Sequence, residues 1–236
     1  MSVAQKLRCR VEQIVNHGER VYTVDLIPER RVPAFRPGQF LHLALDAYDP
    51  SGYWPDSRVF SIASSPAQRE RLRISYSVRG RFTARMAQEL RVGRAVWVKL
   101  PYGEFVIEDA RAVVLLAGGT GITAFTAFLE GLTPDARNQI VLAYGARTSD
   151  LLIYRDLIVQ RAAAIPQLCA IYFVEQTPAR GELPGRVSID ALARATTLPD
   201  AALYYLSGPP AMLRTLADEL RTRAIPLNAI RIDAWE

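Results

Sequence analysis

The pattern of apolar and polar positions changes character about halfway along the chain. Before about Ile107, short runs alternate between apolar and polar residues and are separated by turn residues. Such alternation at regular spacing is typical of antiparallel strands in a barrel or sandwich. The alternating runs are Val21–Leu26, Gln39–Leu45, Arg58–Ser64, Leu72–Val78 and Ala95–Leu100. One short helix is predicted inside this half, at Thr83–Leu90.

After Ala112, continuous apolar runs replace the alternation. The first, AVVLLAGG, is typical of a strand buried on both faces. Further strands are predicted at Gln139–Ala146, Cys169–Glu175, Ala202–Gly208 and Ala229–Ala234. Helices are predicted at Thr123–Gly131, Leu151–Ala164, Ile189–Ala195 and Ala211–Arg223. Strands that alternate with helices form a parallel, doubly wound sheet. We therefore expect an antiparallel β-barrel at residues 1–108 and an α/β domain at residues 109–236.

Composition narrows the class of protein. The 236 residues are 50% hydrophobic and 22% charged, which is typical of a globular chain. No apolar run reaches the roughly 18 residues of a membrane span, and the first residues lack the apolar stretch of a secretory signal. Cys9 and Cys169 are too far apart for a CxxC pair, so a disulfide scaffold, a cysteine-rich zinc site and an iron–sulfur cluster held by this chain alone are not expected. We expect a reducing cytoplasm and no metal site.

The charge is unevenly distributed. Residues 1–108 carry 17 basic and 11 acidic side chains, and the remainder carries 12 and 13. Lys6 and Lys99 are the only lysines, and the other 27 basic residues are arginines. Coding bias in a GC-rich genome is the favoured explanation; the alternative is a basic first half that meets phosphates or an acidic protein. No basic run with interleaved aromatic residues predicts nucleic-acid binding.

Two glycine-containing loops follow buried strands. Gly118-Gly119-Thr120-Gly121 precedes a predicted helix, so its backbone and the helix N-terminus suit a pyrophosphate. Its spacing is neither GxGxxG nor a Walker A loop, and a strand-to-helix turn without ligand is the alternative. Ser207-Gly208-Pro209-Pro210 follows another buried strand at the same sheet edge, although two prolines also simply begin a helix.

Two segments of the first half suit a phosphate and a ring system. In Arg58-Val59-Phe60-Ser61, alternation places Arg58 and Phe60 on one face and Ser61 on the other. An ordinary strand with a surface arginine is the alternative. Gly80-Arg81-Phe82-Thr83 begins a helix, with Thr83 as the predicted N-cap, and forms a second candidate anion site.

These motifs, in this order, resemble the ferredoxin–NADP reductase superfamily. Its flavin signature, Arg-x-Tyr/Phe-Ser, matches Arg58, Phe60 and Ser61. The other family elements match Gly80 and Thr83, Gly103 to Phe105, Gly118 to Ile122, Ala146 to Thr148 with Asp150 and Leu151, and Ser207 to Met212. The resemblance implies a six-stranded barrel that holds FAD and a five-stranded parallel sheet that holds NADH or NADPH.

The resemblance also implies site residues. Ser61 is expected near flavin N5, Ser207 near nicotinamide C4, and Trp235 against the flavin ring; these three are the expected catalytic residues. The expected FAD contacts are Arg58, Val59, Phe60, Ser61, Tyr76, Val78, Gly80, Arg81, Phe82 and Thr83. The expected nicotinamide-nucleotide contacts are Gly118, Gly119, Thr120, Gly121, Ile122, Arg147, Ser207, Gly208, Pro209 and Met212.

Several positions depart from the family pattern. Ser207 replaces the usual Cys, Ala124 a frequent Pro, and Phe60 the commoner Tyr. The stretch Asp46–Ser57 is longer and more aromatic than expected; a surface loop is favoured over a partner-docking lip or part of the flavin pocket. The C-terminal Asp233 and Trp235 lie either near the flavin or simply in a packed last strand.

The predicted function is a flavoprotein reductase that passes a hydride from NAD(P)H to FAD and electrons to a separate acceptor, such as a ferredoxin or an oxygenase component. Two alternatives remain: a flavin reductase that releases reduced flavin, and a non-catalytic partner-binding module of the same fold. Arg147 favours NADPH, but arginine is so abundant here that the choice of donor stays open.

Overall fold

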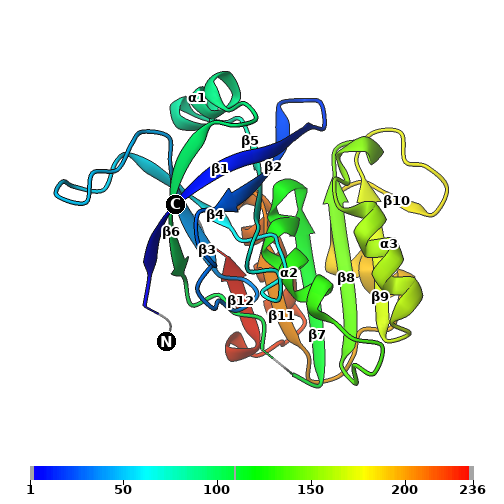
Figure 1. The fold of residues 1–236 in the computed structure, drawn as a ribbon. Helices are drawn as coiled ribbons and strands as arrows, with labels where there is room; N and C mark the ends of the chain where they lie inside the picture. The colour runs from blue at the N-terminus through cyan, green and yellow to red at the C-terminus, as the bar shows by residue number, and fades with distance from the viewer. Residues whose placement is uncertain (1–2, 109, 234–236) are drawn as a thin grey trace. The chain divides into compact units, whose positions relative to one another are not determined.

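The computed structural model describes residues 3–108 and 110–233. The chain divides into two compact units (Figure 1). The first runs to Val106 and also includes Thr126–Gly131, and the second comprises Ile107–Phe125 and continues from Leu132.

The first unit is a six-stranded antiparallel barrel, as predicted. Its strands are β1 (Gln5–Asn16), β2 (Val21–Pro28), β3 (Phe40–Ala44), β4 (Ser57–Ser61), β5 (Leu72–Ser77) and β6 (Ala95–Tyr102), in the order β4-β3-β6-β1-β2-β5. The edge strands β4 and β5 approach each other, so the barrel is nearly closed. Helix α1 (Arg81–Glu89) connects β5 to β6. The long strand β1 was not among the predicted runs, although Leu7, Cys9 and Val11 alternate inward within it.

Alternation builds the barrel core because successive strand residues point to opposite faces. The inward positions are completely buried, among them Val24, Leu41, Ile74 and Val98. From α1, Phe82 and Met86 join the same cluster. The outward positions are therefore left for polar residues.

The second unit is a parallel sheet with helices, which confirms the predicted doubly wound class. Its strands are β7 (Ala112–Gly118), β8 (Gln139–Ala146), β9 (Leu168–Val174), β10 (Glu182–Pro184), β11 (Leu203–Ser207) and β12 (Ile230–Asp233), in the order β10-β9-β8-β7-β11-β12. The resemblance implied five strands, and the structure has six. The additional strand is β10, which was not predicted because its three residues are too few to show a hydrophobic pattern. Every residue of the central strand β7 is buried, which explains its continuous apolar run.

Helices and short 3-10 turns connect the parallel strands. The helices are α2 (Thr123–Gly131), α3 (Arg155–Ala164), α4 (Ile189–Ala195) and α5 (Pro210–Thr222), and the turns are η1 (Gly119–Ile122), η2 (Ser149–Leu151) and η3 (Leu227–Ala229). Because the strands are parallel, their carboxyl ends meet at one edge of the sheet, where open α/β folds bind ligands. Gly118, Ala146, Val174 and Ser207 end their strands at this edge.

Within residues 3–108 and 110–233, no helix is both long enough and apolar enough to cross a membrane. Nor do three His, Cys, Asp or Glu side chains of that part gather closely enough to hold a metal ion. Cys9 is buried and Cys169 partly buried, and both thiols are free.

Both histidines are partly enclosed by the barrel. The His17 ring nitrogen Nε2 lies 2.9 Å from Thr23 Oγ1. Burial lowers the pKa of His17, and burial together with the positive charge of Lys99 lowers the pKa of His42. The unfolded chain therefore binds protons at these positions more tightly than the folded chain does.

Folding stability should consequently fall as the pH drops below the ordinary histidine pKa of about 6.5, and should be insensitive to these groups above it. We expect the thermal midpoint to decrease by a few degrees between about pH 7.5 and about pH 5.5. The double variant His17→Gln, His42→Gln should lose most of this pH dependence. An equally steep dependence in that variant would rule out the histidines as its source.

Candidate cofactor-binding sites

Strand β4 places Arg58 and Phe60 on one face, as the alternation predicts, because they pair with Leu43 and Leu41 of β3. The Arg58 guanidinium lies 5.3 Å from the centre of the Phe82 ring and donates to Asp56 Oδ1 at 2.8 Å. About half of each charged side chain is exposed, and an ion pair of this kind is weak. A phosphate can therefore take the place of the Asp56 carboxylate.

Aromatic rings and one unused hydroxyl lie beside Arg58. Phe60 is half-buried and meets Tyr76 edge-on at 6.1 Å. Tyr76 itself belongs to the barrel core, and burial raises the pKa of its phenol. Ser61 is only 8% exposed, and its hydroxyl has no hydrogen-bond partner within the described part of the chain. An almost buried hydroxyl without a partner is suited to a ligand.

The beginning of α1 corrects one prediction. The N-cap is Gly80, and Thr83 is the third helical residue rather than the cap. Thr83 Oγ1 accepts the N–H groups of Arg79 at 2.9 Å and Gly80 at 3.1 Å and donates to the Gly80 carbonyl. This hydroxyl is thus used by the backbone, and the N–H groups that helix geometry leaves for an anion are those of residues 81–83.

The other expected flavin contacts differ in exposure. Val59 and Val78 are half-buried, and Arg81 is exposed. The Phe82 side chain is buried, so it acts through its contact with Arg58 and through its backbone. Open space adjoins the helix start, because a Cβ atom at Gly80 would meet nothing within 4 Å.

In the second unit, the two predicted nucleotide loops pack directly against each other. A Cβ atom at Gly121 would lie 2.4 Å from the Ser207 carbonyl oxygen, and one at Gly118 would lie 2.4 Å from Met212 Sδ. A Cβ atom at Gly208, which has φ +156, would lie 3.1 Å from the Gly118 backbone. Glycine is required because any side chain would separate the loops. Ile122 is fully buried, so only its backbone is available to a ligand.

A buried polar pair ends strands β11 and β12. Ser207 Oγ donates to Asp233 Oδ2 at 2.8 Å, and the two residues are 2% and 3% exposed. They are register partners on neighbouring parallel strands, which is the signal that could have predicted the pair. The expected catalytic residue Trp235 lies outside the described residues.

The segment after β8 is held by a network that the sequence did not predict. Glu182 accepts hydrogen bonds from Ser149 Oγ at 2.7 Å, from the Ala179 N–H at 2.7 Å and from Arg155. Burial alone would raise the pKa of Glu182, but these hydrogen bonds lower it below its usual value. The exposed Arg147 begins this segment, and its carbonyl accepts the N–H of Gln176 at 2.8 Å.

Comparison with known proteins agrees with this geometry. Residues 115–218 match the family described as "Oxidoreductase NAD-binding domain". The chain is 32% identical over 204 residues to a flavohemoprotein of Bordetella pertussis, an alignment that covers 79% of this chain and 50% of that protein. It is 27% identical over 206 residues to the ferredoxin reductase component of a 3-ketosteroid-9-alpha-monooxygenase from Mycolicibacterium smegmatis. This alignment covers 86% of this chain and 56% of that protein. The chain therefore spans about half the length of these curated relatives.

A solved structure shares the fold of the whole chain. The flavohem-like FAD/NAD binding domain of a nitric oxide dioxygenase from Vibrio cholerae superposes with a TM-score of 0.83 at 19% identity, covering 97% of this chain and 98% of that domain. The expected resemblance is confirmed: residues 115–218 match an oxidoreductase NAD-binding domain, and the chain shares the fold of a flavohem-like FAD/NAD binding domain.

The contact of the glycine loops gives a direct prediction. Gly121→Ala should push the loop away from Ser207, weaken NADH and NADPH binding at least about tenfold, and cost about 1–3 kcal/mol of stability. Gly131→Ala is the matched control: a Cβ atom there meets nothing within 4 Å in a helix, so stability should stay equal or rise by up to about 1 kcal/mol. Nucleotide titration by fluorescence and thermal unfolding measure both effects. Unchanged nucleotide affinity in Gly121→Ala would refute this role of the loop.

Proposed function

We propose that residues 1–108 bind FAD, that residues 109–236 bind NADH or NADPH, and that the protein passes electrons from the nucleotide to a separate acceptor. The observation that carries the proposal is the close packing of the two glycine loops, Gly118 and Gly121 against Ser207 and Gly208, at the carboxyl edge of the sheet. Loops that require glycine there are suited to a pyrophosphate.

The residues of the barrel fit a flavin dinucleotide. Arg58 offers a guanidinium to phosphate, and the first-turn N–H groups of α1 offer a second anion contact. Phe60 presents an aromatic surface, and the Ser61 hydroxyl is unused. When bound, FAD supplies the redox chemistry: it takes two electrons as a hydride from the reduced nicotinamide and passes them on singly.

The residues of the sheet fit the nicotinamide nucleotide. We expect the backbone N–H groups of the Gly118 to Gly121 loop to bind the pyrophosphate, and Arg147 to lie near the adenosine ribose. Asp233 holds the Ser207 hydroxyl in one orientation, so Ser207 is a fixed polar contact for the nicotinamide. Rigid contacts of this kind orient reactants before transfer.

The acceptor is proposed to be another protein. The relative from Mycolicibacterium smegmatis is named as a ferredoxin reductase component, and the Bordetella pertussis relative as a flavohemoprotein. Both names support an electron acceptor of the ferredoxin, oxygenase or haem kind. A cytoplasmic location stays a prediction from the two free cysteines.

The visible spectrum of the purified protein tests the function. We expect flavin absorption that is bleached by NADH or NADPH without oxygen, and the faster nucleotide identifies the donor. Loss of the colour during gel filtration, with turnover restored by added flavin, would support a flavin reductase instead. A colourless protein that binds neither FAD nor nucleotide would leave a partner-binding module.

Arg58→Ala tests the flavin site. We expect a folded protein whose FAD affinity falls at least about tenfold, because a charged hydrogen bond to phosphate contributes roughly 1.5–3 kcal/mol. Arg8→Ala is the control, since Arg8 is an equally exposed barrel arginine with one carboxylate partner. Normal FAD retention by Arg58→Ala, measured by flavin fluorescence, would remove Arg58 from the site.

A further inference from the structure

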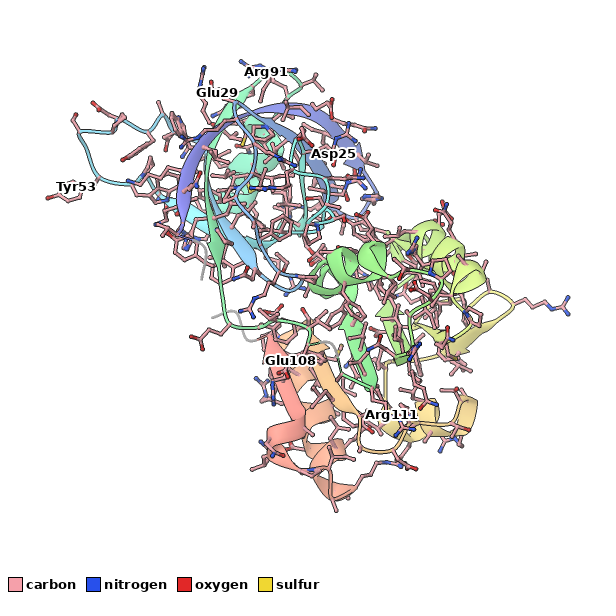
Figure 2. The ribbon with its side chains drawn as sticks, turned by 60° about the horizontal axis from the view of Figure 1, so that its bottom comes forward. Asp25, Glu29, Tyr53, Arg91, Glu108 and Arg111 are labelled. Atoms are coloured by element: carbon pink, nitrogen blue, oxygen red, sulfur yellow. The ribbon has the colours of Figure 1, made fainter. Side chains whose placement is uncertain are left out.

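The loop between β3 and β4 projects from the barrel (Figure 1). Tyr53 lies at its tip and points away from the barrel (Figure 2), and its side chain is 99% exposed. A fully exposed aromatic ring contributes nothing to the core. The ring is therefore fully available to a partner.

Internal contacts hold this loop in one shape. Arg85 donates to both carboxylate oxygens of Asp46 at 2.5 and 3.0 Å. Trp54 Nε1 donates to Ser57 Oγ at 3.0 Å, and Asp49 accepts the Ser51 N–H at 2.9 Å. A loop that is already ordered loses less conformational entropy when it binds a partner.

Beside the loop lies a surface of aromatic rings and lysines, which we call the aromatic–lysine face. It consists of Tyr48, Trp54, Trp97, Tyr102, Lys6 and Lys99. The Tyr48 ring lies 5.4 Å from both tryptophan rings. Lys6 Nζ lies 4.3 Å from the centre of the Tyr48 ring, and Lys99 Nζ lies 5.3 Å from that of Trp54 and 5.2 Å from that of Tyr102.

The two lysines are directly opposite each other in the β1–β6 register. Like charges in that position destabilise a sheet. They are also the only lysines in a chain with 27 arginines, so compositional bias explains the arginines but not this pair. Because the repulsion between Lys6 and Lys99 is unfavourable for folding, we infer that their charge serves a purpose other than folding.

The charge of this face is not neutralised internally. Among the described residues, no carboxylate lies within 4.0 Å of either lysine ammonium, whereas the loop carboxylates Asp46 and Asp56 are paired with Arg85 and Arg58, and Asp49 accepts hydrogen bonds from Ser51. The face thus combines aromatic anchors with unpaired positive charge. Aromatic residues concentrate binding energy at interfaces, and complementary charge speeds association.

We propose that the aromatic–lysine face, with Tyr53, docks an acidic surface of the protein that accepts the electrons. The inference rests on the proposed function, since it names the chemistry of the acceptor's contact surface. The face belongs to the same barrel as Arg58, and the projecting loop leads directly into β4.

Binding measurements with two probes of opposite charge test the proposal. An acidic [2Fe–2S] ferredoxin and basic cytochrome c are titrated against the immobilised protein at several salt concentrations. We expect the ferredoxin to bind with an affinity that falls as salt rises, and cytochrome c to bind at least about tenfold more weakly. Binding of both probes alike, or of neither at low salt, would overturn the proposal.

Three variants locate the contact. Lys6→Gln with Lys99→Gln should weaken ferredoxin binding about tenfold and reduce its salt dependence, and Tyr53→Ser should weaken it several-fold at unchanged salt dependence. The matched control, Arg31→Gln with Arg91→Gln, removes two exposed charges elsewhere on the barrel and should change affinity less than twofold. An equal loss of ferredoxin affinity in the arginine control, or no loss in the lysine variant, would refute the assignment of the aromatic–lysine face as the docking surface. Bleaching of the flavin by NADH or NADPH in the same preparations reports the proposed function independently.

Discussion

The close approach of two loop backbones at the carboxyl edge of the sheet is the constraint on which the second unit depends. Gly121 can approach the Ser207 backbone, and Gly118 the Met212 side chain and the Gly208 backbone, only because neither glycine carries a Cβ atom. The parallel register of β7 and β11 brings the ends of these strands together, although 86 residues separate Gly121 from Ser207 along the chain. A dinucleotide phosphate is bound best by backbone N–H groups with no side chain in the way.

The barrel also leaves groups available to a ligand, but these groups are side chains rather than backbone. Its strands keep the apolar side chains inside, so the edge at β4 carries polar groups that the core does not need. Arg58 is held by an exposed ion pair, one backbone carbonyl and the Phe82 ring, and the Ser61 hydroxyl makes no hydrogen bond among the described residues, which leaves both side chains available to a ligand. The cost of exposing them is small because β3 and the core beneath determine the strand's position.

Surface charge in this protein has two origins. Many arginines form pairs with nearby carboxylates, such as Arg85 with Asp46, and fix loops and helix ends. Lys6 instead donates to the Tyr48 hydroxyl at 2.5 Å, Lys99 lies against the rings of Trp54 and Tyr102, and the two lysines are opposite each other. A ring stabilises a cation without neutralising it, so the positive field persists at the surface.

The sequence by itself determined the class of fold and the identity of the loops, because alternation of period two, continuous apolar runs and glycine at strand ends are local consequences of burial and backbone freedom. It therefore predicted the barrel, the parallel sheet and the positions of Arg58, Ser61 and the Gly118 to Gly121 loop. Only the tertiary structure decided which distant residues meet. Asp233 with Ser207 and Lys6 with Lys99 are brought together by strand register, and Glu182 with Arg155 by the packing of α3 against the sheet; no local pattern encodes either. Thr83 was wrongly predicted as an N-cap because its hydroxyl receives N–H groups from preceding residues rather than from the helix it was expected to cap.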